Sequence, residues 1–283
     1  MEITVTASSL SALLRCSEQA LSENIPRRRG GALLRHAGID LPPAVLDAVV
    51  NATEEALTPR REAWLGRFLV LTGLDKAGKE TQCFNPSRLA SVKSVREFLE
   101  ERGFKVFTVS LPSYETLLGS LVGAYLKRPA LTSPVRIEGD LPTDLAWILW
   151  SLDRAQHNRH VSEWLAQGER NVVLAKRWTE SNVVYQVALG VEAARILRFE
   201  RNIVQPDYIL VLDIPAWEAV ERSKREGFDV DRYEQASFLE RVRENYLKLA
   251  GLSVGKLIRF IEARGSPQEV NMKVLSTLAD LGF

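Results

Sequence analysis

One short segment constrains the fold of this chain more than any other. Residues 73–81 read GLDKAGKET and directly follow the apolar run FLVLT at residues 68–72. The pattern G-x-x-x-x-G-K after a strand is typical of a loop whose backbone N–H groups face phosphate oxygens while the lysine reaches the transferred group. A glycine-bearing turn without a ligand is the alternative. The strand context and the Gly78-Lys79 pair favour a nucleoside-triphosphate site.

The loop lies within a chain that alternates strand-like and helix-like stretches. Four further short β-branched runs lie at residues 105–109, 171–174, 208–213 and 257–261. Helical patterns of ten or more residues separate them, which predicts an α/β fold with a central parallel five-stranded sheet and helices on both faces. Ligands of such sheets bind beyond the carboxyl ends of the strands. We therefore expect the chemistry just after Thr72, Val109, Leu174 and Asp213.

The amino-terminal segment differs in composition from the rest. The first aromatic residue is Trp64 and the first lysine is Lys76. A segment without aromatic side chains has little material for a core of its own, so it should pack on the remainder. Its apolar spacing fits short amphipathic helices, as at Leu10, Leu13, Leu14, Val45, Val49 and Val50. We predict a helical extension over residues 1–66 and one α/β domain over residues 67–283.

Charge and cysteine content exclude several classes of protein. The chain has 37 Lys and Arg against 36 Asp and Glu, a net charge of +1, which argues against binding nucleic acid or acidic membranes by bulk charge. Two cysteines provide no disulfide framework, and no apolar run approaches the roughly 18 residues of a membrane span. The amino terminus lacks an apolar signal core. These features predict a soluble cytoplasmic protein without a membrane or nucleic-acid partner.

From the loop onward, about three quarters of the chain resembles the thymidylate kinase family, P-loop kinases that phosphorylate dTMP with ATP. The loop is similar to that family's G-[IVL]-[DE]-x-x-G-K-[ST]-T-Q, and the later motifs follow in order. LPSYET (111–116) stands at the phosphoryl-acceptor loop, ILWSLDR (148–154) at the base-binding helix, and LAKRW (174–178) in place of D-R-[YH]. PDYILVLDIP (206–215) precedes a segment, 221–250, that matches the lid and the following helix. The resemblance implies a P-loop NTP hydrolase-type three-layer sandwich.

The resemblance also implies roles for individual residues. ATP would be bound by Gly73, Asp75, Lys76, Ala77, Gly78, Lys79, Glu80 and Thr81. The acceptor dTMP would be bound by Asp75, Tyr114, Trp150, Arg154, Arg177 and Tyr185. Catalytic roles would belong to Lys79, Asp75, Arg177, Arg222 and Arg225, and Mg²⁺ would be held by Asp75 and Glu80.

Residue chemistry agrees with these acceptor roles and leaves alternatives open. Trp150 and Arg154 are four apart and share one helix face, offering an apolar plane and a planar donor fork; a core tryptophan is the alternative. Arg177, just past a strand end, would hold the acceptor phosphate, or form a surface ion pair. Asp75 would meet the sugar hydroxyl, or be a solvated carboxylate. Tyr185 would complete the base pocket, or be an ordinary packed aromatic.

Cations cluster in the lid region, which we place at about residues 221–234. Arg222, Lys224, Arg225 and Arg232 lie near Gly227. A mobile lid brings positive groups over the migrating phosphoryl group and excludes water. A charged, solvated helix is the alternative, and Lys76 of the loop is another candidate for the same role.

Three positions depart from the family pattern. Glu80 replaces the hydroxyl that normally ligates Mg²⁺, Lys176 replaces the aspartate of D-R-Y, and Tyr114 stands where many members carry an arginine. The hydroxyl and the aspartate meet at one metal in phosphate-loop enzymes. We therefore predict an ion pair between Glu80 and Lys176 across the usual metal position, since either unpaired buried charge would be costly.

The function that the resemblance implies is transfer of the ATP γ-phosphoryl group to dTMP, giving dTDP. The family also implies a homodimer. A catalytically impaired nucleotide-binding paralogue with a regulatory role is one alternative, favoured by Glu80 and Lys176. A kinase for another nucleotide is a second, suggested by Tyr114. Nucleic-acid binding is a remote third, resting only on the three arginines at residues 27–29.

Overall fold

The computed structural model describes residues 3–60, 63–127, 134–225, 236–252, 255 and 257–283. They fall into two units built from alternating stretches of the chain. Unit 1 comprises Met1–Glu62, Leu111–Ser162 and Leu189–Val204, and unit 2 comprises Ala63–Ser110, Glu163–Ala188 and Gln205–Phe283.

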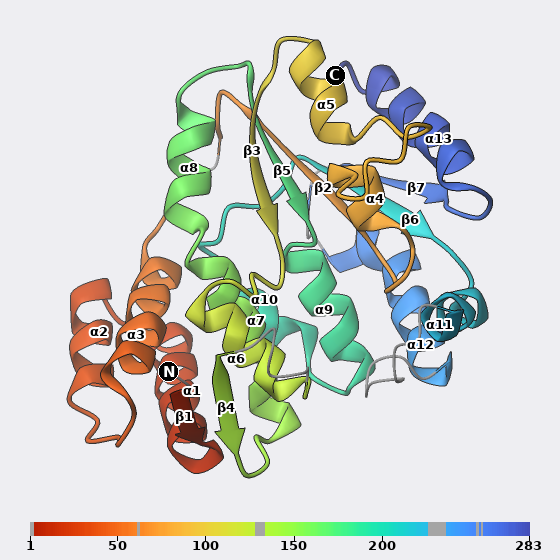
Figure 1. The fold of residues 1–283 in the computed structure, drawn as a ribbon. Coiled ribbons are helices and arrows are strands. Elements are labelled where there is room, and N and C mark those ends of the chain that lie inside the picture. Colours follow the sequence, from red (N-terminus) through yellow and green to blue (C-terminus); the bar gives the residue numbers. More distant parts are fainter. Residues whose placement is uncertain (1–2, 61–62, 128–133, 226–235, 253–254, 256) are drawn as a thin grey trace. The chain divides into compact units, whose positions relative to one another are not determined.

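Unit 2 contains the predicted sheet (Figure 1). Its strands are β2 (Arg67–Gly73), β3 (Lys105–Ser110), β5 (Asn171–Lys176), β6 (Tyr208–Asp213) and β7 (Leu257–Glu262). All pair in parallel in the order β3-β5-β2-β6-β7, which confirms the five predicted strands. Leu71 of β2 lies opposite Lys176 of β5, and Gly73 lies opposite Leu212 of β6. The carboxyl ends of the three central strands therefore meet at one edge.

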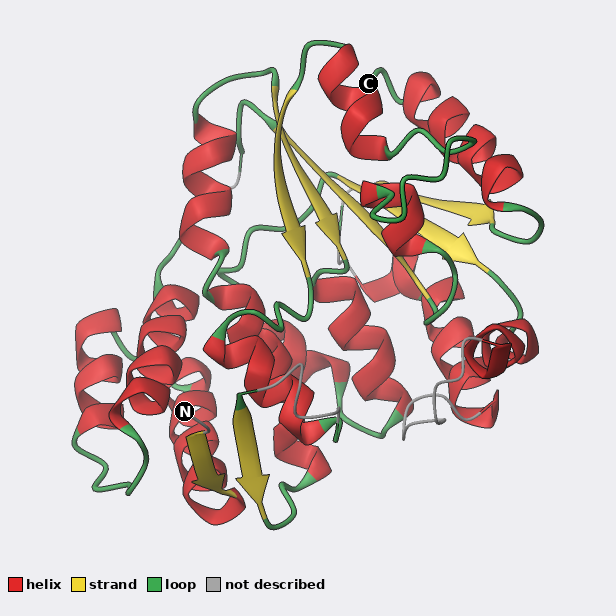
Figure 2. Ribbon diagram, in the orientation of Figure 1, coloured by secondary structure: helices red, strands yellow, loops and turns green. Residues whose placement is uncertain are grey.

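Two groups of helices flank this sheet and give the predicted three-layer sandwich (Figure 2). One group, whose members pack on each other and on the strands, is α4 (Lys79–Phe84), α5 (Val95–Glu101) and α13 (Pro267–Asp280). The other is α9 (Thr179–Ala188), α11 (Ala216–Arg225) and α12 (Ala236–Leu247), followed by the 3₁₀ turn η2 (Leu249–Leu252). Ser94 and Ser266 begin α5 and α13 with capping boxes, in which each serine side chain and the following glutamate satisfy otherwise unpaired N–H groups.

Unit 1 is mainly helical. Its helices are α1 (Ala7–Ser22), α2 (Arg27–Arg35), α3 (Pro43–Leu57), α6 (Leu117–Tyr125), α7 (Thr143–Ala155) and α10 (Ala193–Phe199), while α8 (Asn158–Ala166) includes residues of both units. A parallel pair of short strands, β1 (Ile3–Thr6) and β4 (Val135–Glu138), completes it. The sequence analysis expected only helices before residue 66, so β1 is a difference. Its β-branched residues Ile3–Thr6 pair with a strand more than a hundred residues away, which local periodicity does not reveal.

The amino-terminal helices share a core with later parts of unit 1. α1 and α3 both pack on α7, and α1 also packs on α10. The aromatic side chains missing from the first 63 residues come from Trp147 and Phe199, whose buried rings lie 5.5 Å apart at 81°. Buried Thr53 of α3 donates a hydrogen bond to Ser17 of α1 at 3.1 Å. No helix within the described ranges is both long and apolar enough to cross a membrane.

Candidate active site

The predicted phosphate-binding loop connects β2 to α4 and depends on glycine at both ends. Gly73 has φ +135°, and a Cβ atom there would lie 2.4 Å from the Leu212 carbonyl oxygen of β6. Gly78, directly before α4, has φ +87°. Side chains disfavour this half of backbone space, and at Gly73 the neighbouring strand also leaves no room for one. The glycines of the motif are therefore explained by the backbone itself.

Lys79 is the first residue of α4, directly after this loop. Its side chain is buried, and its ammonium donates a hydrogen bond to the Leu74 carbonyl at 2.5 Å. Burial lowers the pKa of Lys79 well below its ordinary value; the charges of Arg177 and Lys176 lower it further, while Asp75 raises it. A phosphate oxygen would be a stronger acceptor than the neutral carbonyl. The ammonium is therefore well placed to turn to a phosphate.

Arg177, Asp75 and Tyr185 form one hydrogen-bonded cluster beside the loop. Arg177 follows β5 with a φ of +68°, and its guanidinium contacts the Asp75 carboxylate at 2.5 Å and the Gly73 carbonyl at 3.2 Å. The Tyr185 hydroxyl accepts from the Asp75 N–H at 3.2 Å and donates to its carboxylate at 3.4 Å. Burial would lower the pKa of Arg177, but the Asp75 carboxylate opposes this and the pKa lies well above its ordinary value. The three predicted acceptor residues of unit 2 are thus brought together.

Tyr246 is a member of this region that the sequence patterns did not indicate. Its buried hydroxyl forms a 2.8 Å hydrogen bond with the Thr72 hydroxyl and donates at 3.5 Å to the Gly73 carbonyl. Burial raises the pKa of Tyr246, so its hydroxyl stays protonated. Residues 174 positions apart meet here. No spacing rule could have found this contact, because only the packing of α12 creates it.

The ion pair predicted between Glu80 and Lys176 is present. The Lys176 ammonium of β5 contacts the Glu80 carboxylate of α4. The Lys176 side chain is 20% exposed and that of Glu80 is 48% exposed. Thr81, the next residue on α4, is half-buried. The two altered family positions therefore compensate each other's charge.

The predicted metal ligands, Asp75 and Glu80, each have a cation as partner. Asp75 is bound by Arg177, and Glu80 by Lys176. Across the described part of the chain, no group of three or more His, Cys, Asp or Glu side chains could hold a metal ion. Magnesium takes an octahedron of oxygen ligands. Each carboxylate that could hold Mg²⁺ beside a nucleotide phosphate is paired with a cation in this structure, so the assignment of Asp75 and Glu80 to Mg²⁺ stays a prediction.

Arg222 is bound to the loop rather than projecting into solvent. Its guanidinium donates to the Lys76 carbonyl and to the Ala263 carbonyl, both at 3.1 Å, and forms a 2.6 Å ion pair with Glu218. It therefore links α11 to the phosphate loop and to the end of β7. Arg225 is exposed and lies 3.5 Å from Glu221.

The rest of the predicted lid lies outside the described residues. Positions 226–235, which include Gly227 and Arg232, belong to this part of the chain.

Three predicted acceptor residues belong to unit 1. The Arg154 guanidinium forms a buried ion pair with Glu200, whose carboxylate also accepts from Ser151 at 2.6 Å. The Trp150 ring packs edge-on against Tyr125 at 5.6 Å. Tyr114 is half-buried, in the loop before α6. Arg154 thus has an internal carboxylate partner that spacing did not indicate, and these three roles stay predictions.

The loop predicted to carry the acceptor motif is held by the carboxyl end of α7. The Asp153 carboxylate accepts from the Ser113 N–H at 3.0 Å, and the Ser113 hydroxyl forms a 2.8 Å hydrogen bond with His157. Gln156 donates to Thr116 at 3.0 Å. Burial raises the pKa of Asp153 to about 7 and lowers the pKa of His157 to about 4. These positioning contacts were missed because ILWSLDR was interpreted only through Trp150 and Arg154.

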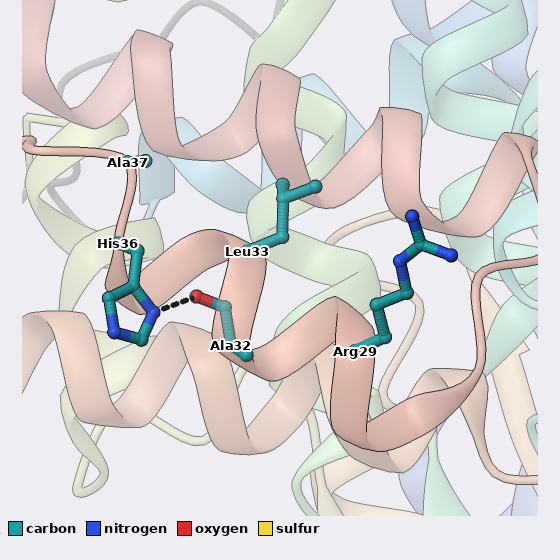
Figure 3. A pocket seen from close by; sticks show the side chains of 5 residues that line it. All are labelled: Arg29, Ala32, Leu33, His36 and Ala37. Carbon is teal, nitrogen blue, oxygen red and sulfur yellow. Dashed lines mark hydrogen bonds between the residues drawn. The ribbon is translucent and has the colours of Figure 1, made fainter.

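A shallow hollow on α2 includes the last of the three consecutive arginines (Figure 3). It is lined by Arg29, Ala32, Leu33, His36 and Ala37. The His36 ring forms a 2.7 Å hydrogen bond with the Ala32 carbonyl. Arg27 lies 3.5 Å from Glu54 and from Glu55, so acidic neighbours reduce the charge of this run. The remote nucleic-acid alternative gains no support here.

Comparison with known proteins identifies the family. The family described as "Thymidylate kinase" matches residues 71–274, which include the phosphate loop, Lys176 and Arg177 at the end of β5, and α9. The chain belongs to the thymidylate kinase family. "Probable thymidylate kinase" of Pyrococcus abyssi is 30% identical over 213 residues, which cover 75% of this chain and 95% of that protein. "Thymidylate kinase" of Arabidopsis thaliana is 28% identical over 228 residues, 81% of this chain and 74% of that one.

Solved structures show the same fold. A thymidylate kinase from Candida albicans matches with a TM-score of 0.52 at 18% identity, covering 77% of this chain and 92% of that one. This likeness supports the P-loop α/β fold alone. Family membership makes this chain a nucleotide kinase by relationship.

Proposed function

We propose that this protein transfers the γ-phosphoryl group of ATP to dTMP, giving dTDP and ADP. The observation that carries the proposal is the cluster of Asp75, Arg177 and Tyr185, which is hydrogen-bonded to the first glycine of the phosphate loop. A donor-phosphate loop and a guanidinium suited to an acceptor phosphate are thereby fixed beside each other. Family membership supplies the prior for the reaction.

On the donor side, the loop backbone and Lys79 would bind the ATP phosphates. Gly73 and Gly78 allow the backbone to wrap, and the buried Lys79 ammonium would turn from the Leu74 carbonyl to a phosphate oxygen. Arg222 would fix the loop through the Lys76 carbonyl. Asp75, Lys76, Ala77 and Thr81 are assigned to ATP by the family resemblance, whereas Glu80, also assigned there, is paired with Lys176 in this structure.

On the acceptor side, Arg177 would hold the phosphate of dTMP. An oxygen of that phosphate would form a bond to the γ-phosphorus while the bond to the bridging oxygen breaks and its electron pair leaves with ADP. The protein contributes alignment and positive charge rather than covalent chemistry. Tyr114, Trp150 and Arg154 are assigned to acceptor binding by the family resemblance, as Arg225 is to the lid.

A catalytically impaired nucleotide-binding protein is the second candidate. The Glu80–Lys176 ion pair favours it, because this pair replaces the groups that normally hold Mg²⁺ in phosphate-loop enzymes. The buried Lys79 and the Arg177 guanidinium beside the loop favour a working kinase, because cations of this kind bind phosphates. A kinase for another nucleotide would share this geometry.

The test is ADP release by the purified chain with ATP and MgCl₂, supplied in parallel with dTMP, dUMP and the other monophosphates. We expect the fastest turnover with dTMP and dTDP as the product. Lys79→Met should abolish turnover, whereas Lys105→Met, at the opposite end of the strands, should not. Saturable ATP binding without turnover would favour the impaired protein, and preference for another monophosphate would refute dTMP as the acceptor.

The family resemblance also predicts a homodimer in the cytoplasm. Light scattering of the full chain tests the first prediction, with a mass near 64 kDa expected for two copies of the 31.8 kDa chain. A mass of one chain at working concentration would contradict it.

A further inference from the structure

Lys176 is fixed at the edge of the sheet where ligands of such folds bind. It is the last residue of β5, opposite Leu71 of β2 and Ser110 of β3. The next residue, Arg177, is bonded to the phosphate loop, and Glu80 directly follows the loop lysine. The backbone of Lys176 is therefore rigid, while its four-carbon stem gives its ammonium reach.

The surroundings of Lys176 carry an excess of positive charge. The loop and the end of β5 bring together the cations Lys79, Lys176 and Arg177 and the carboxylates Asp75 and Glu80. Lys176 is close enough to Lys79 to lower the pKa of its ammonium. The cations of this cluster repel one another, and the binding of a polyanion relieves that repulsion.

The partner of Lys176 is one that it can exchange. The Glu80 side chain is 48% exposed, so its carboxylate remains hydrated and its attraction for the ammonium is weak. A terminal nucleotide phosphate group carries more negative charge than a carboxylate and accepts charge-assisted hydrogen bonds strongly. Exchange of Glu80 for phosphate is therefore favourable. Because Asp75 and Glu80 are each paired with a cation, an ammonium is the cation that this site itself provides.

We propose that Lys176 is a phosphate ligand of this site: it leaves Glu80 for a nucleotide phosphate and makes nucleotide binding independent of a metal ion held by the protein. The inference rests on the nucleotide-binding part of the proposed function and not on phosphoryl transfer. Glu80 acts as a competitor that holds the ammonium in place until the phosphate arrives.

The test is calorimetric titration of the full chain with ADP and with ATP, in EDTA and in MgCl₂. For the parent chain, we expect Kd values that differ by less than about threefold between the two conditions. Lys176→Met should weaken binding about 10- to 100-fold, the loss of one charge-assisted hydrogen bond. Glu80→Gln should tighten binding about two- to fivefold by removing the competitor. Lys105→Met is the matched control and should leave Kd unchanged.

The two single variants should change Kd in opposite directions, which distinguishes a phosphate ligand from a pair that only stabilises the structure. If the pair only stabilised the loop, Lys176→Met and Glu80→Gln would weaken binding alike, and that result would overturn the inference. The Glu80→Ser, Lys176→Asp variant, which restores a hydroxyl and an acid, should bind at least about tenfold more tightly in Mg²⁺ than in EDTA. Circular dichroism verifies that each variant is folded.

These titrations, combined with the ADP-release assay, separate this inference from the proposed function. Metal-independent binding without turnover would support the inference and refute the kinase. Metal-dependent binding with turnover would refute the inference alone, and the absence of binding by either nucleotide would refute both.

Discussion

Asp153 and His157 should give the stability of this protein two opposing dependences on pH. Both contact Ser113 of the acceptor-motif loop, and both have pKa values displaced by burial. The pKa of Asp153 rises from 3.8 to about 7, and that of His157 falls from 6.5 to about 4. We consider the variants Asp153→Asn and His157→Gln, each of which removes one titration.

The sign for each group follows from which state binds the proton. Between pH 4 and 7 folded Asp153 keeps a proton that the unfolded chain has lost, so stability falls as pH rises. The rise of the pKa from 3.8 to about 7 corresponds to a fall of about 4 kcal/mol in the free energy of unfolding. Between pH 4 and 6.5 the unfolded chain protonates His157 and the folded protein does not. Stability therefore rises with pH, by at most about 3 kcal/mol since the ring is partly exposed. In the parent chain the two contributions nearly cancel.

The assay is urea unfolding followed by circular dichroism at several pH values from 4 to 8. The stability of Asp153→Asn relative to the parent should increase across this range by about 4 kcal/mol, and that of His157→Gln should decrease by up to about 3 kcal/mol. A constant offset from altered hydrogen bonds changes neither slope. Relative stabilities that are flat within about 1 kcal/mol, or that change in the same direction for both variants, would refute the reasoning.

Three further predictions concern the two units separately. Gly73→Ala should lose about 1–3 kcal/mol of stability and its ADP affinity, because φ is +135° and the new Cβ would meet the Leu212 carbonyl; an unchanged melting temperature would contradict this. Arg154→Met should lose about 3–5 kcal/mol in urea unfolding by leaving the Glu200 carboxylate buried and unpaired. Adding Glu200→Gln should recover part of the lost stability, and no recovery would show that the unpaired Glu200 carboxylate is not the cause of the loss. Lys79→Met should melt no lower than the parent but lose at least about 100-fold in turnover, and equal turnover would remove Lys79 from catalysis.

Much of the fold could be predicted because its patterns are local. The five strands of the sheet are short β-branched runs, and their alternation with helices permits few topologies. The roles of Gly73 and Gly78 in the phosphate loop could be predicted, because this loop needs backbone angles that favour glycine. The strand β1 could not, since Ile3–Thr6 becomes a strand only by pairing with Val135–Glu138.

The candidate site divides in the same way. The Glu80–Lys176 pair was predictable, because an acid and a base replace two motif residues that meet at one metal in phosphate-loop enzymes. The ion pair of Arg154 with Glu200 was not, because nothing in the sequence links residues 46 positions apart. Tyr246 behind the loop is a similar case.

The sequence by itself determined the phosphate loop, the parallel sheet and the family, because each is encoded in short motifs and their order. Apart from the Glu80–Lys176 pair, only the tertiary structure decided which charges are neutralised by which partners. Arg154 is bound to Glu200 within unit 1, Arg222 donates to the carbonyls of Lys76 and Ala263, and the Asp75 carboxylate is paired with Arg177. The physical reason is that hydrogen bonds and ion pairs act over a few ångströms, and these distances are set by packing between distant segments.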